Sequence, residues 1–182
     1  DESADFIMAK KICIDAKIQY PTACNAVETI LVHKNFKFYE KLKKELQNVD
    51  IKVIENPKEY DVEYSDKILT LKKVNNMNEA IEHINSFGSH HTDSIITNDD
   101  ANAEIFMNNV DSAGVFHNAS TRFSDGFRYG FGAEVGISTN KTHARGPVGL
   151  DGLCIYKYKL TGKGQIVDDY AKGIKTFKHK DI

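Results

Sequence analysis

The side chain in this sequence best suited to chemistry is Cys24, a thiol within residues 18–33, IQYPTACNAVETILVH. Pro21 and the small residues around Cys24 favour an irregular turn, and the apolar run 30–32 indicates a buried strand soon after it. A thiol on a turn that leads into a core strand is held rigidly and stays reachable, as a cysteine nucleophile must be. A cysteine also packs as a small buried hydrophobe. The local sequence slightly favours this packing role.

A second cluster of polar groups lies at residues 118–125, NASTRFSD. It combines an amide, several hydroxyls and Arg122, whose planar guanidinium binds carboxylate or phosphate with two hydrogen bonds. Ser, Thr, Asn and Asp are equally typical of loop caps and turns. From the residues alone, a ligand site and a capped loop are therefore equally good interpretations of this stretch.

Two further patterns give no site. His90, His91 and Asp93 have the side chains of a metal site, but adjacent residues of an extended chain point to opposite sides, so loop packing or hydrogen bonding is favoured. The glycines at 130, 132 and 136 lack the G-x-G-x-x-G spacing, and GPVGLDG lacks the Lys-Ser/Thr of a P-loop. No nucleotide fingerprint is visible, and no metal site is predicted.

Composition excludes several classes of protein. The 182 residues suffice for one well-cored domain, with 41% hydrophobic and 27% charged side chains. A net charge of −2 offers no basic surface for nucleic acid, and no apolar run approaches the roughly 18 residues that span a bilayer. Three scattered cysteines, Cys13, Cys24 and Cys154, argue against a disulfide framework and fit a reducing compartment. We expect a cytoplasmic protein, or an organellar one if a preceding segment carries a targeting signal.

The elements that position these groups alternate between strands and helices, which predicts an α/β fold with a mostly parallel sheet flanked by helices. Helices are expected at 6–17, 35–48, 78–84 and 101–109, and strands at 29–33, 51–54, 67–74, 94–97 and 113–116. The glycine-rich stretch from 117 is expected to be long, irregular and functional. Residues 154–160, CIYKYKL, alternate as an edge strand or arm that pairs elsewhere.

Three long blocks of the chain resemble the γ-glutamyl phosphate reductases of the aldehyde dehydrogenase superfamily. The first block is residues 20–33, YPTACNAVETILVH. The second is residues 74–95, and the third is residues 118–153, which begins NASTRFSDGFRYGFGAEVGIST. The blocks are ordered and together span most of the chain; Phe87 is a conservative departure from the usual tyrosine or histidine. The tail from Gly162 is most similar to the bifunctional pyrroline-5-carboxylate synthases, in which a glutamate 5-kinase domain precedes the reductase.

The resemblance implies NADPH-dependent reduction of γ-glutamyl 5-phosphate to glutamate 5-semialdehyde, a step of proline biosynthesis, through a thioester on Cys24. For that cysteine it favours the nucleophile over the packing role. The oxyanion of the tetrahedral intermediate is expected to meet the Cys24 backbone N–H. The remaining implied assignments are Asn118 as a brace of the active-site loop and part of the substrate site, Ser120, Thr121 and Arg122 at the substrate α-carboxylate, and Glu63 at the nicotinamide ribose.

The resemblance also predicts the domain organisation. Residues 1–153 correspond to the catalytic thiol domain and 154–182 to a C-terminal β arm that builds a homo-oligomer interface, while most of the cofactor-binding domain would precede Asp1. We therefore expect a piece of a longer polypeptide that does not turn over alone. Two rival functions stay open: another thioester-forming aldehyde dehydrogenase, and a non-catalytic assembly module of the same fold.

Overall fold

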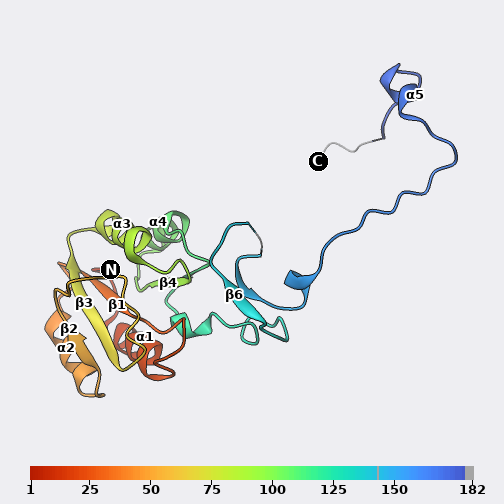
Figure 1. The fold of residues 1–182 in the computed structure, drawn as a ribbon. Coiled ribbons are helices and arrows are strands. Elements are labelled where there is room, and N and C mark those ends of the chain that lie inside the picture. Colours follow the sequence, from red (N-terminus) through yellow and green to blue (C-terminus); the bar gives the residue numbers. More distant parts are fainter. Residues whose placement is uncertain (143, 179–182) are drawn as a thin grey trace.

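A computed structural model describes residues 1–142 and 144–178. Five strands run parallel in two sheets (Figure 1). The larger sheet has the order β1-β3-β2, and the smaller pairs β4 with β5. The bounds are β1 Thr29–His33, β2 Lys52–Ile54, β3 Ile68–Val74, β4 Thr92–Ile95 and β5 Gly114–His117. The predicted parallel α/β architecture is confirmed.

Four helices connect and cover these strands. They are α1 Phe6–Ile18, α2 Tyr39–Gln47, α3 Met77–Phe87 and α4 Asp100–Asn109. Side-chain caps explain where three of them begin: Asp5 accepts from the Met8 backbone N–H at 2.8 Å, and Asn76 and Asp99 do the same for α3 and α4. The Asn76 cap starts α3 before the expected residue 78. The helix expected from residue 35 begins only at Tyr39, because the chain first turns to place Phe36 in the core.

Two apolar clusters stabilise the part of the chain from α1 to β5, here called the body. The larger lies where α1 and α2 pack on the three-stranded sheet, and Leu46, Leu69 and Leu71 are almost wholly buried there. The smaller joins α3 and α4 to the two-stranded sheet around Ile81 and Phe106. In each cluster the helices bury apolar residues against the neighbouring sheet.

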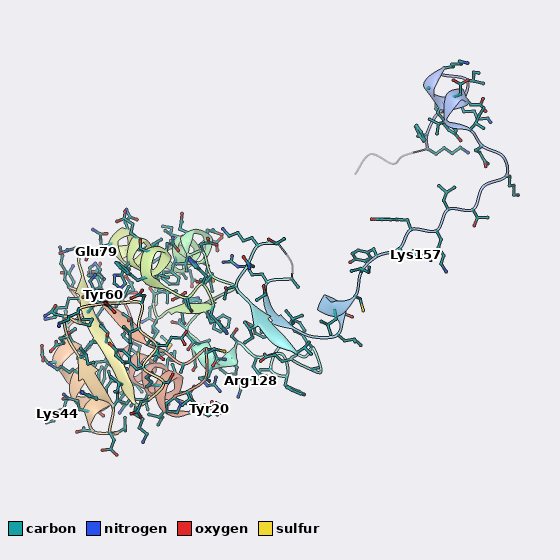
Figure 2. All side chains as sticks on the ribbon, in the orientation of Figure 1. Tyr20, Lys44, Tyr60, Glu79, Arg128 and Lys157 are labelled. Atoms are coloured by element: carbon teal, nitrogen blue, oxygen red, sulfur yellow. The ribbon has the colours of Figure 1, made fainter. Side chains whose placement is uncertain are left out.

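The C-terminal part of the chain corrects two expectations. The stretch 117–153 is not wholly irregular, since it contains a 3₁₀ turn, Thr121–Phe123 (η1), and an antiparallel hairpin of β6 (Gly136–Ser138) and β7 (Gly146–Val148). The strand expected at 154–160 does not form in the described structure. This segment runs away from the body, with Lys157 marking its course (Figure 2).

The tail beyond β7 is short of regular structure. It holds a second 3₁₀ turn, Asp151–Leu153 (η2), and a short helix, α5 (Val167–Ala171). The last four residues of the predicted arm, 179–182, lie outside the described residues. Among the helices that are described, none has the length and apolar character needed to cross a membrane.

Candidate active site

Cys24 lies on the turn between α1 and β1 and is exposed. Two hydrogen bonds fasten the residue that follows it to η1 and its flank: Asn25 donates through Nδ2 to the Ser124 carbonyl at 2.7 Å, and Thr121 donates through Oγ1 to the Asn25 carbonyl at 2.6 Å. A thiol on a loop tied down by buried partners combines access with rigidity. The packing role that the local sequence favoured therefore does not describe this cysteine.

Cys13 supplies the contrast within the same chain. It is buried in α1 against the main core. Burial raises the pKa of its thiol to about 12. A thiol that stays protonated inside the core is unreactive, so Cys13 packs while Cys24 is available for chemistry.

His91 is the nearest polar partner of the Cys24 thiol. Its Nε2 lies 3.3 Å from Cys24 Sγ, and its Nδ1 lies 2.7 Å from Thr92 Oγ1, which holds the ring in place. The imidazole is 5% exposed. In the sequence, His91 stands out only as a possible metal ligand, because 67 positions separate it from Cys24 and no local spacing links the two.

The neighbouring His90 turns away from this site. Its backbone is left-handed, with φ of 58°, and its Nδ1 lies 2.7 Å from the Asp111 carbonyl oxygen. The two imidazoles thus face different partners, as the geometry of adjacent residues suggests. Among residues 1–142 and 144–178, no group of three metal-ligating side chains comes together.

The electrostatics of the pair favour its neutral form. Burial raises the pKa of the Cys24 thiol, the carboxylates of Glu134 and Glu63 add to the rise, and hydrogen bonding to its own backbone N–H and the Arg122 guanidinium oppose it. Burial also lowers the pKa of His91, against the opposing pull of the same two carboxylates. Near neutral pH the resting pair is therefore a thiol beside an uncharged imidazole.

Arg122 brings a guanidinium close to the thiol. Its Nε donates to Gln19 Oε1 at 2.7 Å, and its Cζ lies 5.7 Å from the centroid of the Tyr20 ring. Within the part of the chain that the structure describes, no carboxylate lies at ion-pair distance from it, although the side chain is only 8% exposed. A buried guanidinium without an anion is a ready partner for one.

The other predicted substrate residues are engaged with the protein. Ser120 Oγ caps η1 by accepting from the Arg122 backbone N–H, and Thr121 fixes the cysteine loop as described above. Asn118, in a left-handed conformation with φ of 54°, accepts from the Thr97 N–H and donates to the Thr97 carbonyl. Its side chain thus braces the turn after β4, and these bonds do not reach the loop of Cys24.

Two carboxylates flank the site. Glu63 lies on the exposed loop before β3 and lines the same pocket as Cys24, where its charge reaches both members of the thiol–imidazole pair. Glu134, which no sequence motif singles out, accepts from the Gly126 N–H at 2.9 Å and acts on the pair more strongly than Glu63. Its position on the loop before β6 becomes visible only in three dimensions.

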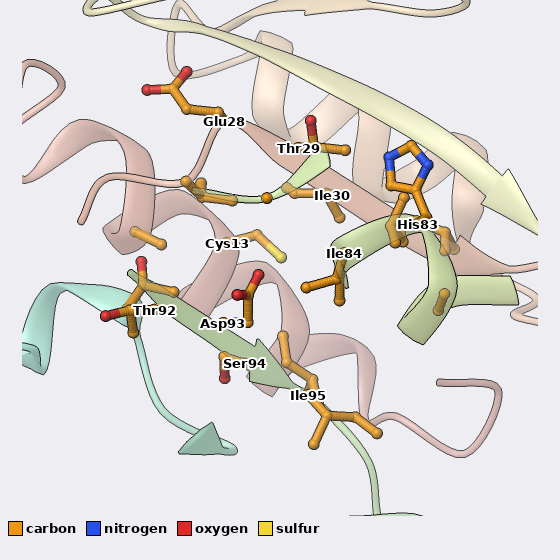
Figure 3. A pocket seen from close by; sticks show the side chains of 18 of the residues that line it. Cys13, Glu28, Thr29, Ile30, His83, Ile84, Thr92, Asp93, Ser94 and Ile95 are labelled. Carbon is orange, nitrogen blue, oxygen red and sulfur yellow. The ribbon is translucent and has the colours of Figure 1, made fainter. Parts of the chain in front are cut away.

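A pocket of about 360 Å³ opens beside the cysteine loop and continues between β1 and β4. Figure 3 shows Thr29 and Ile30 on one side, Asp93 and Ile95 on the other, and Ile84 of α3 reaching in. Near Cys24 the lining includes Thr22, Glu63 and Thr121. The nucleophile therefore stands at a concave, partly apolar site of a size that admits a small molecule.

One buried acceptor in this region has no partner. The side-chain oxygen of Asn25 is the single buried side-chain polar atom without a hydrogen bond among the described residues. It belongs to the residue after the nucleophile, and its own amide nitrogen is already used. A desolvated carbonyl oxygen without a donor costs free energy in the folded state, because it has lost its hydrogen bonds to water.

Comparisons with curated proteins find close relatives. The chain is 59% identical to a γ-glutamyl phosphate reductase from Brachyspira hyodysenteriae and 55% identical to one from Acetivibrio thermocellus. Each alignment covers 100% of this chain and 46% of the relative. The chain thus spans about half the length of the curated relatives it matches. No protein-family model matches it.

Solved structures agree with the sequence comparison. The crystal structure of a γ-glutamyl phosphate reductase from Thermotoga maritima matches with a TM-score of 0.88 at 41% identity, over 91% of this chain and 44% of that one. An acetylating aldehyde dehydrogenase from Geobacillus thermoglucosidasius matches with a TM-score of 0.63 at 19% identity, over 89% and 50%, and shows the shared fold alone.

These comparisons confirm the resemblance read from the three sequence blocks, and with it the aldehyde dehydrogenase-like fold. The relatives named here carry the reductase's name alone and align with the whole chain, tail included. They therefore give no support to the predicted fusion with a kinase.

Proposed function

We propose that this chain is the thiol-bearing part of a γ-glutamyl phosphate reductase. The reaction is reduction of γ-glutamyl 5-phosphate to glutamate 5-semialdehyde with release of phosphate, in proline biosynthesis. The relatives at 50–59% identity support this assignment, as does the agreement in fold with the Thermotoga maritima enzyme. The alignments cover this whole chain, Cys24 included.

The observation that carries the proposal is the exposed Cys24 on a fastened loop at the mouth of a pocket. Its sulfur attacks the acyl phosphate carbonyl, and phosphate leaves readily. The thioester that results accepts hydride far more easily than a carboxylate does. The backbone N–H of Cys24 is the expected donor to the oxyanion formed in the attack.

Substrate binding is assigned to the end of the pocket near η1. The Arg122 guanidinium, buried without an anion among the described residues, receives the substrate α-carboxylate. Ser120 and Thr121 keep Arg122 and the cysteine loop in register, and their hydroxyl oxygens still have lone pairs for a substrate donor. Asn118 contributes by bracing the turn after β4.

The cofactor of the family is a nicotinamide dinucleotide, and NADPH is the form that we propose. When bound, it supplies the hydride. Glu63 fits the role of holding its ribose, since the carboxylate is exposed at the pocket and has no hydrogen bond or ion pair among the described residues. Ribose hydroxyls are donors that such a free acceptor binds.

The division of labour along the chain follows. Residues 1–153 form the catalytic thiol domain, and 154–182 form an arm that joins subunits of a homo-oligomer in the full protein. The chain spans 46% of the first relative, and we propose that most of the cofactor site lies in the remainder. We place the enzyme in the cytoplasm, and we expect the chain alone to form the thioester without steady-state turnover.

A burst experiment tests the proposal. The chain is mixed with γ-glutamyl phosphate generated in place by glutamate 5-kinase and ATP, and protein-bound acyl groups are located by peptide mass spectrometry. We expect about one acyl group per chain on Cys24, none in Cys24→Ala, and unchanged labelling in the matched control Cys154→Ser. Added NADPH should not be consumed continuously.

Three results would contradict it in different ways. An unmodified Cys24 in folded protein would favour the non-catalytic assembly module. Acylation by other acyl donors but not by γ-glutamyl phosphate would favour a different thioester-forming aldehyde dehydrogenase. Sustained oxidation of NADPH would overturn the expectation that the chain lacks turnover.

A further inference from the structure

We propose that His91 is the proton acceptor and donor for Cys24: it takes the thiol proton as sulfur attacks and returns it when the thioester is reduced. The assignment rests on the proposed function, which supplies the electrophile. It adds to that function a catalytic residue that neither the sequence blocks nor the names of the relatives assign.

Geometry is the first support. His91 Nε2 lies 3.3 Å from Cys24 Sγ, within hydrogen-bonding distance for sulfur, and a proton can pass between these atoms directly. The opposite ring nitrogen lies 2.7 Å from Thr92 Oγ1, so the ring cannot rotate freely. An oriented imidazole against a cysteine sulfur is the arrangement in which a thiol is activated for attack.

Placement on the fold is the second support. Cys24 comes from the turn after α1 and His91 from the residue before β4, on two separate sheets. The body thus contributes one partner from each sheet, and each is fixed by its own neighbours. The thiol is exposed while the imidazole is 5% exposed, so substrate reaches the sulfur and the base stays shielded from water.

The surrounding charges suit a base that is neutral at rest. Burial lowers the pKa of His91, and Glu134 and Glu63 are the charged groups that oppose this shift. Cys24 meets the same carboxylates and Arg122. An uncharged imidazole is available to accept a proton near neutral pH, and the two carboxylates stabilise the imidazolium that forms during the attack.

Each step conserves atoms, electrons and charge. In acylation the S–H bond breaks, its proton moves to Nε2, the S–C bond forms, and the C–O bond to phosphate breaks with its electron pair on phosphate. A bound reduced nicotinamide would supply the hydride that reduces the acyl carbon, and would itself be oxidised. The C–S bond then breaks with its electrons on sulfur, and His91 returns the proton to the thiolate.

Alkylation of Cys24 by iodoacetamide tests the base without using the substrate. Rates in His91→Gln are compared with the wild-type chain by peptide mass spectrometry between about pH 6 and 9. We expect about a 10²-fold loss at pH 7, within the range for one general base. His90→Asn is the matched control, because asparagine tolerates the left-handed backbone there, and its rate should stay within about twofold of wild type.

The pH profile separates a base from a structural residue. In the wild-type chain the rate should change little between about pH 7 and 8, where His91 is already neutral. Without the base, the rate should follow the thiolate fraction and rise about tenfold per pH unit below the pKa of Cys24. Equal rates and equal profiles in wild type and folded His91→Gln would overturn the proposal.

Chemical rescue covers the case in which a variant is merely destabilised. His91→Ala leaves space beside the sulfur, and free imidazole should restore alkylation and acylation in proportion to its concentration. Restored alkylation with no acylation of the wild-type chain by γ-glutamyl phosphate would refute the proposed function and leave the assignment of the base intact. If folded His91→Ala is alkylated as fast as the wild-type chain and imidazole adds nothing, His91 is not the base for Cys24.

Discussion

The body of the molecule and its tail use the same kinds of residues with opposite results. In β3 apolar residues such as Leu69 and Leu71 are buried between helices and neighbouring strands. In the tail, Ile155, Tyr156 and Leu160 are each at least 93% exposed. Both segments have the side chains of a strand, but among the described residues only the first pairs with other strands. A strand pattern therefore records a capacity to pair, and the neighbours decide whether pairing occurs.

Two leucines test this contrast most strongly. Leu46 is fully buried at the end of α2. The substitution Leu46→Ala should lower the free energy of unfolding by about 3 kcal/mol, because it opens a cavity in the core. Leu160→Ala, at 94% exposure, should change it by less than about 0.5 kcal/mol. Urea denaturation measures both. Equal losses would mean that the tail packs on the body in solution.

Self-association should depend on the tail. We expect the chain to associate as its concentration rises, because the exposed segment 154–160 offers an unpaired strand with large apolar side chains. The double substitution Tyr156→Lys and Tyr158→Lys should shift sedimentation velocity profiles towards monomer, while Lys157→Glu serves as the control on the other face. A monomeric wild-type chain at every concentration would count against the arm.

A partly buried carboxyl, Asp93, should give a distinctive pH dependence. Burial raises the pKa of Asp93, although Ser112 donates to its Oδ2 at 2.6 Å. The folded state therefore holds the proton more tightly than the unfolded state. This contribution to stability is complete below the unfolded pKa and is lost as pH rises through the folded one. Asp93→Asn should flatten the decline in unfolding free energy between about pH 4 and 8, and an unchanged slope would contradict the burial of its charge.

The ion pairs that attach the hairpin to the body should weaken as pH falls, the opposite of the dependence expected for Asp93, and their effect should be smaller. Lys141 and Arg145 lower the pKa of exposed Asp111, so their contact is present above the ordinary aspartate pKa and is lost as pH falls through the lowered value. Asp111→Asn should speed tryptic cleavage after Arg145 a few-fold. Asp151→Asn, remote from this contact, should not.

The regular elements of the body could be located from the sequence because their signals are local. The strand predicted at 29–33 and the helix predicted at 101–109 agree with β1 and α4 to within one residue. Caps such as Asp5, apolar stripes and glycine stops act within a few residues of where they are read. The hairpin of β6 and β7 was not predicted, because its strands are only three residues long and rich in glycine.

In the candidate site, too, some residues could be identified from the sequence and others only from the structure. The long blocks of sequence showed the resemblance to the reductases, which the comparisons confirm, and singled out Cys24, Arg122 and Glu63 for roles that remain predictions. The pairing of His91 with the thiol was not predicted. Nothing in the spacing of His90 and His91 tells which imidazole meets a cysteine 67 positions away.

By itself, the sequence determined the order of helices and strands up to residue 117, the apolar faces and the likeness to the reductases, because these depend on residue types and short spacings. The tertiary structure alone decided that Cys24 is exposed on a fastened loop, and which side chains surround it. It also left the strand pattern at 154–160 unpaired within residues 1–142 and 144–178. The physical reason is common to all three: burial, pKa shifts and strand pairing depend on contacts between residues distant in sequence, and a linear pattern does not encode those distances.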